Sequence, residues 1–292
     1  MATMTTIAIT GASGKLGGAT IGHLLERNVA PSSIIAIVRD PAKVMELAAR
    51  GVEVRRGDYN EPASLENALR GVDRLAFISS SSLGDERLLQ HGNVVKAARA
   101  TRVGHIFYTS VIKPAAQAHF AASPGHFHTE ALIRESGIAH TFFRNNLYLD
   151  LVPLMFGSAV TTGKLAHNAA DGRIGFVSRQ DIAEALAVAL SMNPVAQVHD
   201  ITAITPYGLA DVAAGLGKAS GKQITYEPLS SEEFRGLLEG LGLPAPVVGM
   251  SVALGEAMRA GEFDVGSRDL ERLLGRAPTT LQDFLAKALA AK

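Results

Sequence analysis

The chain has 292 residues, and its 28 lysines and arginines balance 28 aspartates and glutamates, so the formal net charge is zero. This balance offers no basic surface for duplex nucleic acid. The absence of cysteine excludes disulfide scaffolds, thiolate zinc sites and cysteine nucleophiles. Hydrophobic residues make up 47% of the chain and charged residues 19%, which argues against long disordered segments. We expect about two globular lobes and no nucleic-acid partner.

Targeting and membrane signals are absent from the sequence. The first ten residues contain no basic region followed by an apolar run. No apolar stretch reaches the roughly 18 residues that a membrane span needs. We therefore expect a cytoplasmic location and no association with a membrane.

Short apolar runs alternate with helical patterns along the first half of the chain. The runs that predict strands lie at 7–10, 34–38, 52–54, 75–78, 105–108 and 140–143. The helical patterns between them lie at 15–27, 42–49, 63–69, 87–100 and 127–135. Near-continuous apolar strands separated by helices indicate a parallel sheet that is covered on both faces. We predict an α/β protein with a doubly wound Rossmann sheet.

Helical patterns dominate after about residue 150. They lie at 181–190, 209–216, 232–241, 270–274 and 281–289, with a short strand at 224–227. We predict a Rossmann domain over residues 1–150 and a smaller, mostly helical lobe over 151–292 that caps the strand ends, and we expect the chain to cross between the lobes more than once. The apolar helices near the C-terminus are candidates for a homodimer face, although such stripes more often pack into a core, so the oligomeric state is open.

A glycine-rich turn directly follows the first predicted strand and opens the first predicted helix. Its residues are Gly11, Ala12, Ser13, Gly14, Lys15, Leu16 and Gly17, with the spacing G-x-x-G-x-x-G. The first glycine permits the tight turn, the second lets backbone N–H groups approach a pyrophosphate, and the third lets helix and strand pack closely. This context predicts a dinucleotide site, and a structural turn without ligand is the alternative.

The end of the second predicted strand bears on the choice of dinucleotide. Arg39 and Asp40 stand there side by side. An acidic residue at this point holds the ribose hydroxyls of NAD, whereas an arginine suits the 2′-phosphate of NADP. Because Arg39 comes first, we favour NADP(H). The simpler interpretation is a solvated Arg39–Asp40 pair, or Asp40 as the cap of the next helix.

Residues that follow two further predicted strands are expected to line the same dinucleotide site. Asp58 follows the third predicted strand, where its carboxylate is placed to accept from an adenine amino group. Ser79, Ser80 and Ser81 follow the fourth, where small residues allow ribose and phosphates to approach the backbone. The alternatives are that Asp58 caps the next helix and that the serines form a flexible loop.

Several motifs together carry a family resemblance. ITGASGKLG, IVRDPAK, GVEVRRGDY, FISSS, YTS, the H-x-x-T-E of His126 to Glu130, and FRNNLY occur in this order over nearly the whole chain. They resemble the NmrA-like branch of the atypical short-chain dehydrogenases, and most of all its members that reduce quinones and triphenylmethane dyes with NADPH. The resemblance implies a Rossmann domain, NADP(H), and a cleft between two lobes for a flat electrophile.

The resemblance also implies roles for individual residues. Pyrophosphate contacts would come from Gly11, Ser13, Gly14, Lys15 and Leu16. The resemblance implies contacts from Arg39 to the 2′-phosphate, from Asp58 to the adenine, and from Ser79, Ser80 and Ser81 to the ribose and phosphates. It places Asn145 near the nicotinamide.

One departure from ordinary short-chain dehydrogenases concerns catalysis. None of the five tyrosines has a lysine four residues later, so the Tyr-x-x-x-Lys dyad that transfers protons in alcohol–ketone chemistry is missing. Quinone reduction tolerates this loss, because a quinone accepts hydride readily and its oxygen can be protonated by water. We take His126 as a ribose or substrate hydrogen-bonding group and Tyr148 as a substrate wall or proton donor. Simpler roles are a satisfied helix-start histidine and interlobe packing.

We therefore predict hydride transfer from NADPH to a small-molecule quinone or a similar conjugated acceptor, without flavin or metal. The main alternative is an NADP-binding regulator or redox sensor without turnover, and an epimerase or ketoreductase is weaker because the dyad is missing. The pattern His126-x-His128-x-Glu130 does not predict a zinc site, because only its first and last residues share a helix face.

Overall fold

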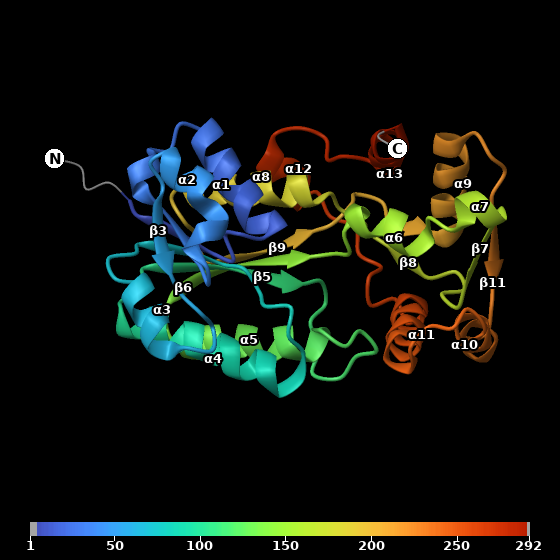
Figure 1. Cartoon of the computed structure of the whole chain (residues 1–292), viewed down its shortest axis with the longest axis horizontal. Coiled ribbons are helices and arrows are strands. Elements are labelled where there is room, and N and C mark those ends of the chain that lie inside the picture. Colours follow the sequence, from blue (N-terminus) through green and yellow to red (C-terminus); the bar gives the residue numbers. More distant parts are fainter. Residues whose placement is uncertain (1–4, 291–292) are drawn as a thin grey trace.

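The computed structural model describes residues 5–290 of the chain. Its centre is a sheet of seven parallel strands in the order β3-β2-β1-β4-β5-β6-β9 (Figure 1). The strands are β1 (Ile7–Thr10), β2 (Ile34–Val38), β3 (Glu53–Arg56), β4 (Arg74–Phe77), β5 (His105–Val111), β6 (Ala139–Asn145) and β9 (Gln197–Ile201). This order confirms the predicted Rossmann sheet. The strand order reverses between β1 and β4, and ligands of open α/β sheets bind at such a point.

The strand register brings the carboxyl ends of all strands to one edge of the sheet. Thr10 pairs with Ile37, and Val111 pairs with Asn145. Every pairing between neighbours in this sheet is parallel. Loops that leave these ends therefore meet at the same edge.

Helices cover both faces of the sheet (Figure 1). One face carries α3 (Pro62–Ala68), α4 (Gly84–Ala100) and α5 (Ser123–Glu135). The other carries α1 (Lys15–Glu26), α2 (Met45–Ala49), α8 (Arg179–Ser191) and α12 (Asp269–Leu274). Side chains of β1 alternate between the two layers, since Ile7 and Ile9 belong to one core and Ala8 to the other. Short 3₁₀ turns lie at η1 (Pro31–Ser33), η2 (Pro41–Val44) and η3 (Leu149–Leu151).

A second lobe lies beyond the carboxyl ends of β5, β6 and β9 (Figure 1). Its helices are α6 (Val152–Phe156), α7 (Ala159–Thr162), α9 (Leu209–Ser220), α10 (Ser231–Gly240), α11 (Ala245–Arg259) and α13 (Leu281–Ala290). Its strands form two pairs, β7 (Lys164–His167) with β11 (Thr225–Pro228), and β8 (Arg173–Ile174) with β10 (Tyr207–Gly208). A separate apolar core fills this lobe. Leu281 and Leu285 of α13 are buried in that core, which accounts for the apolar stripe near the C-terminus.

The chain crosses back to the sheet after residue 150. α8 packs along α1, β9 joins the sheet beside β6, and α12 packs on both α8 and β9. The residues from 151 onward are thus shared between the two lobes, and residue 150 does not separate them. The reason is visible in α8, whose residues from Ile182 to Leu190 are buried almost without interruption because they lie between α1 and the sheet.

The start of α5 and the presence of α11 differ from the sequence expectation. α5 begins at Ser123 instead of residue 127, because Pro124 sits in the first turn, where its missing N–H costs no hydrogen bond. α11 is not among the helices predicted from the sequence, and Pro244 and Pro246 occupy its cap and first turn. Within residues 5–290, no helix has the length and apolar character to cross a membrane.

Candidate functional site

The glycine turn between β1 and α1 is built for close backbone packing. Gly11 has a φ of +60°, and the Gly14 N–H donates to the Gly11 carbonyl at 2.9 Å. A Cβ on Gly17 would lie 2.5 Å from the Gly11 carbonyl oxygen, too close for any side chain. The first and third glycines are therefore required by the geometry of the turn.

The amino end of α1 is open to a ligand. Among the described residues, no side chain caps this helix, and Ser13, Gly14 and Lys15 are exposed. Ala12 and Leu16 are buried and anchor the turn to the core. Free N–H groups and the positive end of the helix dipole make such a terminus an anion site.

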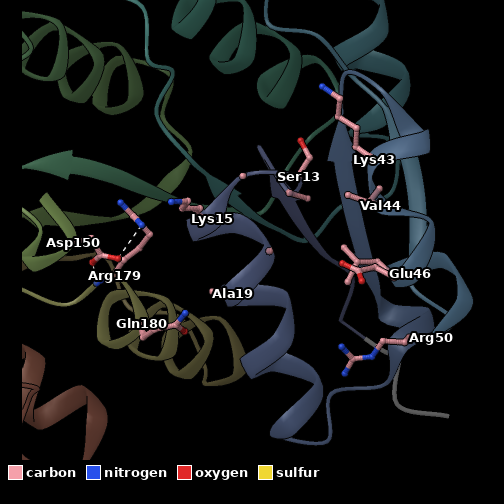
Figure 2. A pocket seen from close by; sticks show the side chains of 14 residues that line it. Ser13, Lys15, Ala19, Lys43, Val44, Glu46, Arg50, Asp150, Arg179 and Gln180 are labelled. Carbon is pink, nitrogen blue, oxygen red and sulfur yellow. Dashed lines mark hydrogen bonds and ion pairs between the residues drawn. The ribbon is translucent and has the colours of Figure 1, made fainter. Parts of the chain in front are cut away.

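A groove of about 610 Å³ surrounds this helix end (Figure 2). Besides the turn it is lined by residues of η2 and α2 on one side and by Asp150 and the start of α8 on the other. The lining side chains that carry charge are Lys15, Lys43, Glu46, Arg50, Asp150 and Arg179. Positive groups outnumber negative ones, which suits a phosphate-bearing ligand. Of this set, the sequence predicts only Lys15, because the others come from distant segments.

Arg39 and Asp40 have different surroundings at the end of β2. The Asp40 carboxylate accepts from the Ala42 N–H at 3.1 Å and caps η2. Arg39 is exposed, and its side chain makes no hydrogen bond or ion pair to residues 5–290. The cap role suggested for Asp40 is therefore observed, and the Arg39 guanidinium is left available at the sheet edge.

The loop after β3 is tied to its neighbours. Asp58 accepts from the Asn60 N–H at 2.9 Å, so its carboxylate stabilises the turn that precedes α3. The hydroxyl of Tyr59 lies 2.6 Å from Thr10 Oγ1 and 2.7 Å from the Ile78 carbonyl oxygen. Tyr59 thus connects the ends of β1, β3 and β4.

The serine loop, residues 79–82 after β4, is held by two residues of α4. Arg87 donates from Nε to the Ser82 carbonyl at 2.6 Å and from a terminal nitrogen to the Ser80 carbonyl at 2.7 Å. The Ser80 N–H donates to His91 Nε2 at 3.0 Å. The Ser80 hydroxyl oxygen is buried and has no partner among the described residues. The loop backbone is fixed while one hydroxyl remains available.

Asn145 ends β6 with an unsatisfied amide. The residue is 3% exposed, and neither its Nδ2 nor its Oδ1 has a hydrogen-bond partner in the described part of the chain. A buried amide without partners is costly. It therefore points to a ligand at the carboxyl edge of the sheet.

His126 pairs with a residue to which the sequence patterns assign no role. Its Nδ1 lies 2.8 Å from the hydroxyl of Tyr108, a fully buried residue of β5. Burial lowers the pKa of His126 well below its ordinary value, and the nearby Arg87 and His91 lower it further. Burial raises the pKa of Tyr108. Both side chains are therefore neutral at pH 7.

Glu130, four residues after His126, belongs to a different network. It accepts from Ser110 at 2.8 Å, from Arg144 at 2.9 and 2.8 Å and from Arg134 at 2.7 Å. Burial alone would raise the pKa of Glu130, but these hydrogen bonds hold it below its usual value. The ionised carboxylate fixes Ser110 as a donor within the protein. His126 and Glu130 thus have separate partners, although they share a helix face.

Tyr148 lies where the chain passes from β6 into the second lobe. Its ring is half-buried and lies 5.3 Å from the guanidinium carbon of Arg179. Arg179 donates to Asp150 at 2.9 Å, an ion pair that Figure 2 shows beside Lys15. Burial raises the pKa of Tyr148, and the Arg179 charge opposes this shift only in part.

Taken by position, the candidate residues fall into two groups along one edge. The glycine turn, Arg39 and the groove surround the amino end of α1. The serine loop is hydrogen-bonded to Arg87 and His91, which also lie near His126, while Asn145 ends β6 and Tyr148 follows that strand. Within residues 5–290, no three His, Asp or Glu side chains come together to hold a metal.

Comparison with known proteins identifies the family. The NmrA-like family matches residues 3–285, almost the entire chain. The chain belongs to the NmrA-like family.

Relatives of this NmrA-like chain include characterised reductases. Quinone oxidoreductase 2 of Escherichia coli is 39% identical over 282 residues, which cover 96% of this chain and 97% of the relative. A crystal structure of that NADPH-dependent enzyme with NADPH has a TM-score of 0.89 at 36% identity and covers 98% of this chain and 99% of the other. The triphenylmethane reductase of Citrobacter sp. with NADP(H) has a TM-score of 0.89 at 37% identity, over 97% and 100% of the two chains.

Proposed function

We propose that this chain is an NADPH-dependent reductase that transfers hydride to a quinone or a similar flat, conjugated small molecule. It is an oxidoreductase of the NmrA-like family that binds NADP(H). The observation that carries the proposal is the buried, unpartnered amide of Asn145 at the same sheet edge as the open amino end of α1. The open end of α1 suits a pyrophosphate, and the Asn145 amide suits a polar ring substituent.

The residues present fit the cofactor. Gly11 and Gly17 permit the tight turn that presents backbone N–H groups to the pyrophosphate, and Lys15 adds a positive charge. Arg39 and Lys43 would hold the 2′-phosphate, and Asp58 the adenine. The loop of Ser79, Ser80 and Ser81 would contact ribose and phosphates. When bound, NADPH supplies a hydride together with the electron pair of its C4–H bond.

The acceptor side relies on positioning. We assign Asn145 to orient the nicotinamide end, His126 to hydrogen-bond the acceptor or a ribose, and Tyr148 to form a wall of the acceptor site. A quinone accepts hydride without prior protonation by a catalytic acid, so alignment of the reacting atoms supplies most of the rate. The acceptors in the names of the two reductases, a quinone and a triphenylmethane dye, support a conjugated substrate. The cytoplasmic location and a homodimer remain predictions.

The decisive assay follows NADPH oxidation by absorbance with a panel of quinones and triphenylmethane dyes. We expect turnover with at least one quinone, and much weaker oxidation of NADH. Tight NADPH binding without oxidation by any acceptor would contradict the proposal and favour an NADP-binding sensor. A matched assay with simple ketones and alcohols should show no activity, because the Tyr-x-x-x-Lys dyad is missing.

A further inference from the structure

A chain of buried hydrogen bonds fixes the protonation of His91. The Ser80 N–H can only donate, so His91 Nε2 at 3.0 Å is an acceptor. Burial and the nearby Arg87 lower the pKa of His91 to about 3, so the ring is neutral and its proton lies on Nδ1. That N–H faces Thr129 Oγ1 at 2.8 Å, and the Thr129 hydroxyl donates to the Gly125 carbonyl at 2.7 Å. Each hydrogen bond in this series therefore has one consistent donor and one consistent acceptor.

The protonation of His91 bears on the direction in which the Tyr108 hydroxyl donates its hydrogen bond. The Tyr108 hydroxyl lies 2.8 Å from His126 Nδ1 and 3.5 Å from His91 Nδ1. His91 Nδ1 carries a proton and cannot accept. Among the described residues, His126 Nδ1 is the acceptor at hydrogen-bond distance from the Tyr108 hydroxyl, so we assign the Tyr108 proton to that bond and the proton of the neutral His126 ring to Nε2.

His126 Nε2 is then a donor without an acceptor inside the protein. Within the described residues, this nitrogen makes no hydrogen bond. It is not fully enclosed by the protein, so it retains contact with solvent. His126 lies next to the serine loop, since both neighbour Arg87 and His91. His126 therefore lies near the β4 end of the candidate site.

We infer that Tyr108 is a positioning residue that fixes His126 as an Nε2–H donor, and that this N–H donates to the acceptor oxygen that becomes negative during reduction. The second half of this inference rests on the proposed function. The inference specifies the tautomer of His126 that acts and the buried residue, Tyr108, that sets this tautomer.

The proton balance assigns His126 a hydrogen-bonding role. Hydride brings two electrons and one hydrogen to a quinone, which leaves a monoanion that takes up one proton to become a hydroquinone. A neutral imidazole that lost its Nε2 proton would either become an imidazolate or draw the proton of Tyr108 and leave a buried tyrosinate. Both outcomes place an unpaired charge in the interior. Water therefore supplies the proton, and His126 stabilises the developing negative charge, as an oxyanion-hole donor does.

Two readouts test the inference on the full-length protein. Two-bond ¹H–¹⁵N spectra of the imidazoles should show the Nε2–H form of His126 in wild type, and the loss of that preference in Tyr108→Phe, which keeps the ring and removes only the hydroxyl. With a quinone, we expect kcat of Tyr108→Phe to fall about 10- to 100-fold, while NADPH affinity stays within about twofold. An Nδ1–H form in wild type overturns the inference, as does an unchanged kcat in Tyr108→Phe.

Matched variants separate a positioning role from a structural one. His126→Gln offers an amide N–H near the position of Nε2 and should retain more kcat than His126→Ala, whereas equal losses contradict donation to the acceptor. His128, exposed on the same helix, supplies the control, and His128→Ala should match wild type. If wild type turns over no acceptor, the proposed function fails together with the donor role. The imidazole spectra still confirm or refute the arrangement of Tyr108 and His126.

Discussion

The two halves of the candidate site stand at one edge of the same sheet but are made of different parts. Around the amino end of α1, the proposed binding groups are mainly backbone N–H groups, and the glycines contribute by lacking side chains. Around the ends of β4 and β5, the groups are side chains of α4, α5 and β5 that fix one another by hydrogen bonds. In the first half, a side chain at Gly17 would clash with the backbone of the turn, whereas the second half depends on particular polar partners.

This difference predicts how each half fails. An added methyl group in the backbone half moves several N–H groups at once, because they share one turn. A change in the side-chain half that preserves shape removes one hydrogen bond and leaves the cradle intact. Cofactor affinity should therefore respond to the first half, and the rate of hydride transfer to the second.

The largest effect is expected for Gly17→Val. A Cβ at this position would lie 2.5 Å from the Gly11 carbonyl oxygen, so the turn must shift. We expect NADPH affinity, measured by fluorescence titration, to fall at least roughly 100-fold because the N–H groups are misplaced. Gly22→Ala on the same helix is the control, since a Cβ there has nothing within 4 Å. It should leave affinity unchanged and add about 0.5–1 kcal/mol to the free energy of unfolding. Equal affinities for the two variants would refute the role of the turn.

Arg39→Ala should have the next largest effect, confined to one cofactor. Arg39 is exposed at the end of β2, without a partner in the part of the chain that the structure describes. Hydrogen bonds to charged groups contribute about 1.5–3 kcal/mol, so NADPH affinity should fall roughly 10- to 100-fold. NADH affinity should hardly change, because NADH lacks the 2′-phosphate. Arg27→Ala, an exposed arginine at the end of α1, is the control. An NADPH affinity that survives Arg39→Ala would remove Arg39 from the site.

The histidines of the side-chain half predict a pH dependence of stability. The pKa of His91 is about 3 in the folded protein, because of burial first and of Arg87 second, against an ordinary value of 6.5. Protons therefore bind the unfolded chain more tightly. The stability contributed by neutral His91 is complete above pH 6.5 and is lost as the pH falls from 6.5 toward 3. Between pH 7 and pH 5 this amounts to about 2 kcal/mol.

Urea unfolding at pH 7 and pH 5 measures this loss. His91→Gln should reduce the difference between the two pH values by up to about 2 kcal/mol. His128→Ala, which removes an exposed imidazole from α5, should keep the full difference. If His91→Gln leaves the pH dependence intact, then His91 is not the neutral, buried group that the hydrogen bonds indicate.

The two halves also differ in how far the sequence predicts them. The glycine turn is local, so its spacing and its place between strand and helix indicate its role directly. Arg39 follows because parallel strands end at one edge, and Asn145 follows from the family resemblance. Tyr108 gives no such signal, because its partner His126 is 18 residues away and the contact depends on how α5 packs against β5. Arg87 and His91 were missed for the same reason.

The fold shows a similar limit. Apolar runs predicted all six strands of the first half, whereas β9, whose residues include the polar Gln197, His199 and Asp200, carries too weak an apolar pattern to be recognised. The sequence pattern of α8 predicts a helix and does not show which lobe it joins. Only its packing along α1 assigns it to the sheet. Which distant segments pack together depends on the packing of both hydrophobic cores as a whole. A short stretch of sequence does not contain that information.

The smallest effect is expected for Tyr148→Phe, at the junction of the two halves. Its ring contacts the Arg179 guanidinium, and burial raises the pKa of its hydroxyl, which makes it a poor proton donor. We expect kcat and KM for a quinone within about twofold of wild type, because the ring and its stacking on Arg179 remain. Tyr148→Ala should raise KM several-fold while leaving kcat nearly unchanged, since it removes a wall and no hydrogen bond in the transition state. A fall in kcat for Tyr148→Phe comparable to that of Tyr108→Phe would instead make Tyr148 the proton donor. The side-chain half of the candidate site would then extend across β6 into the second lobe.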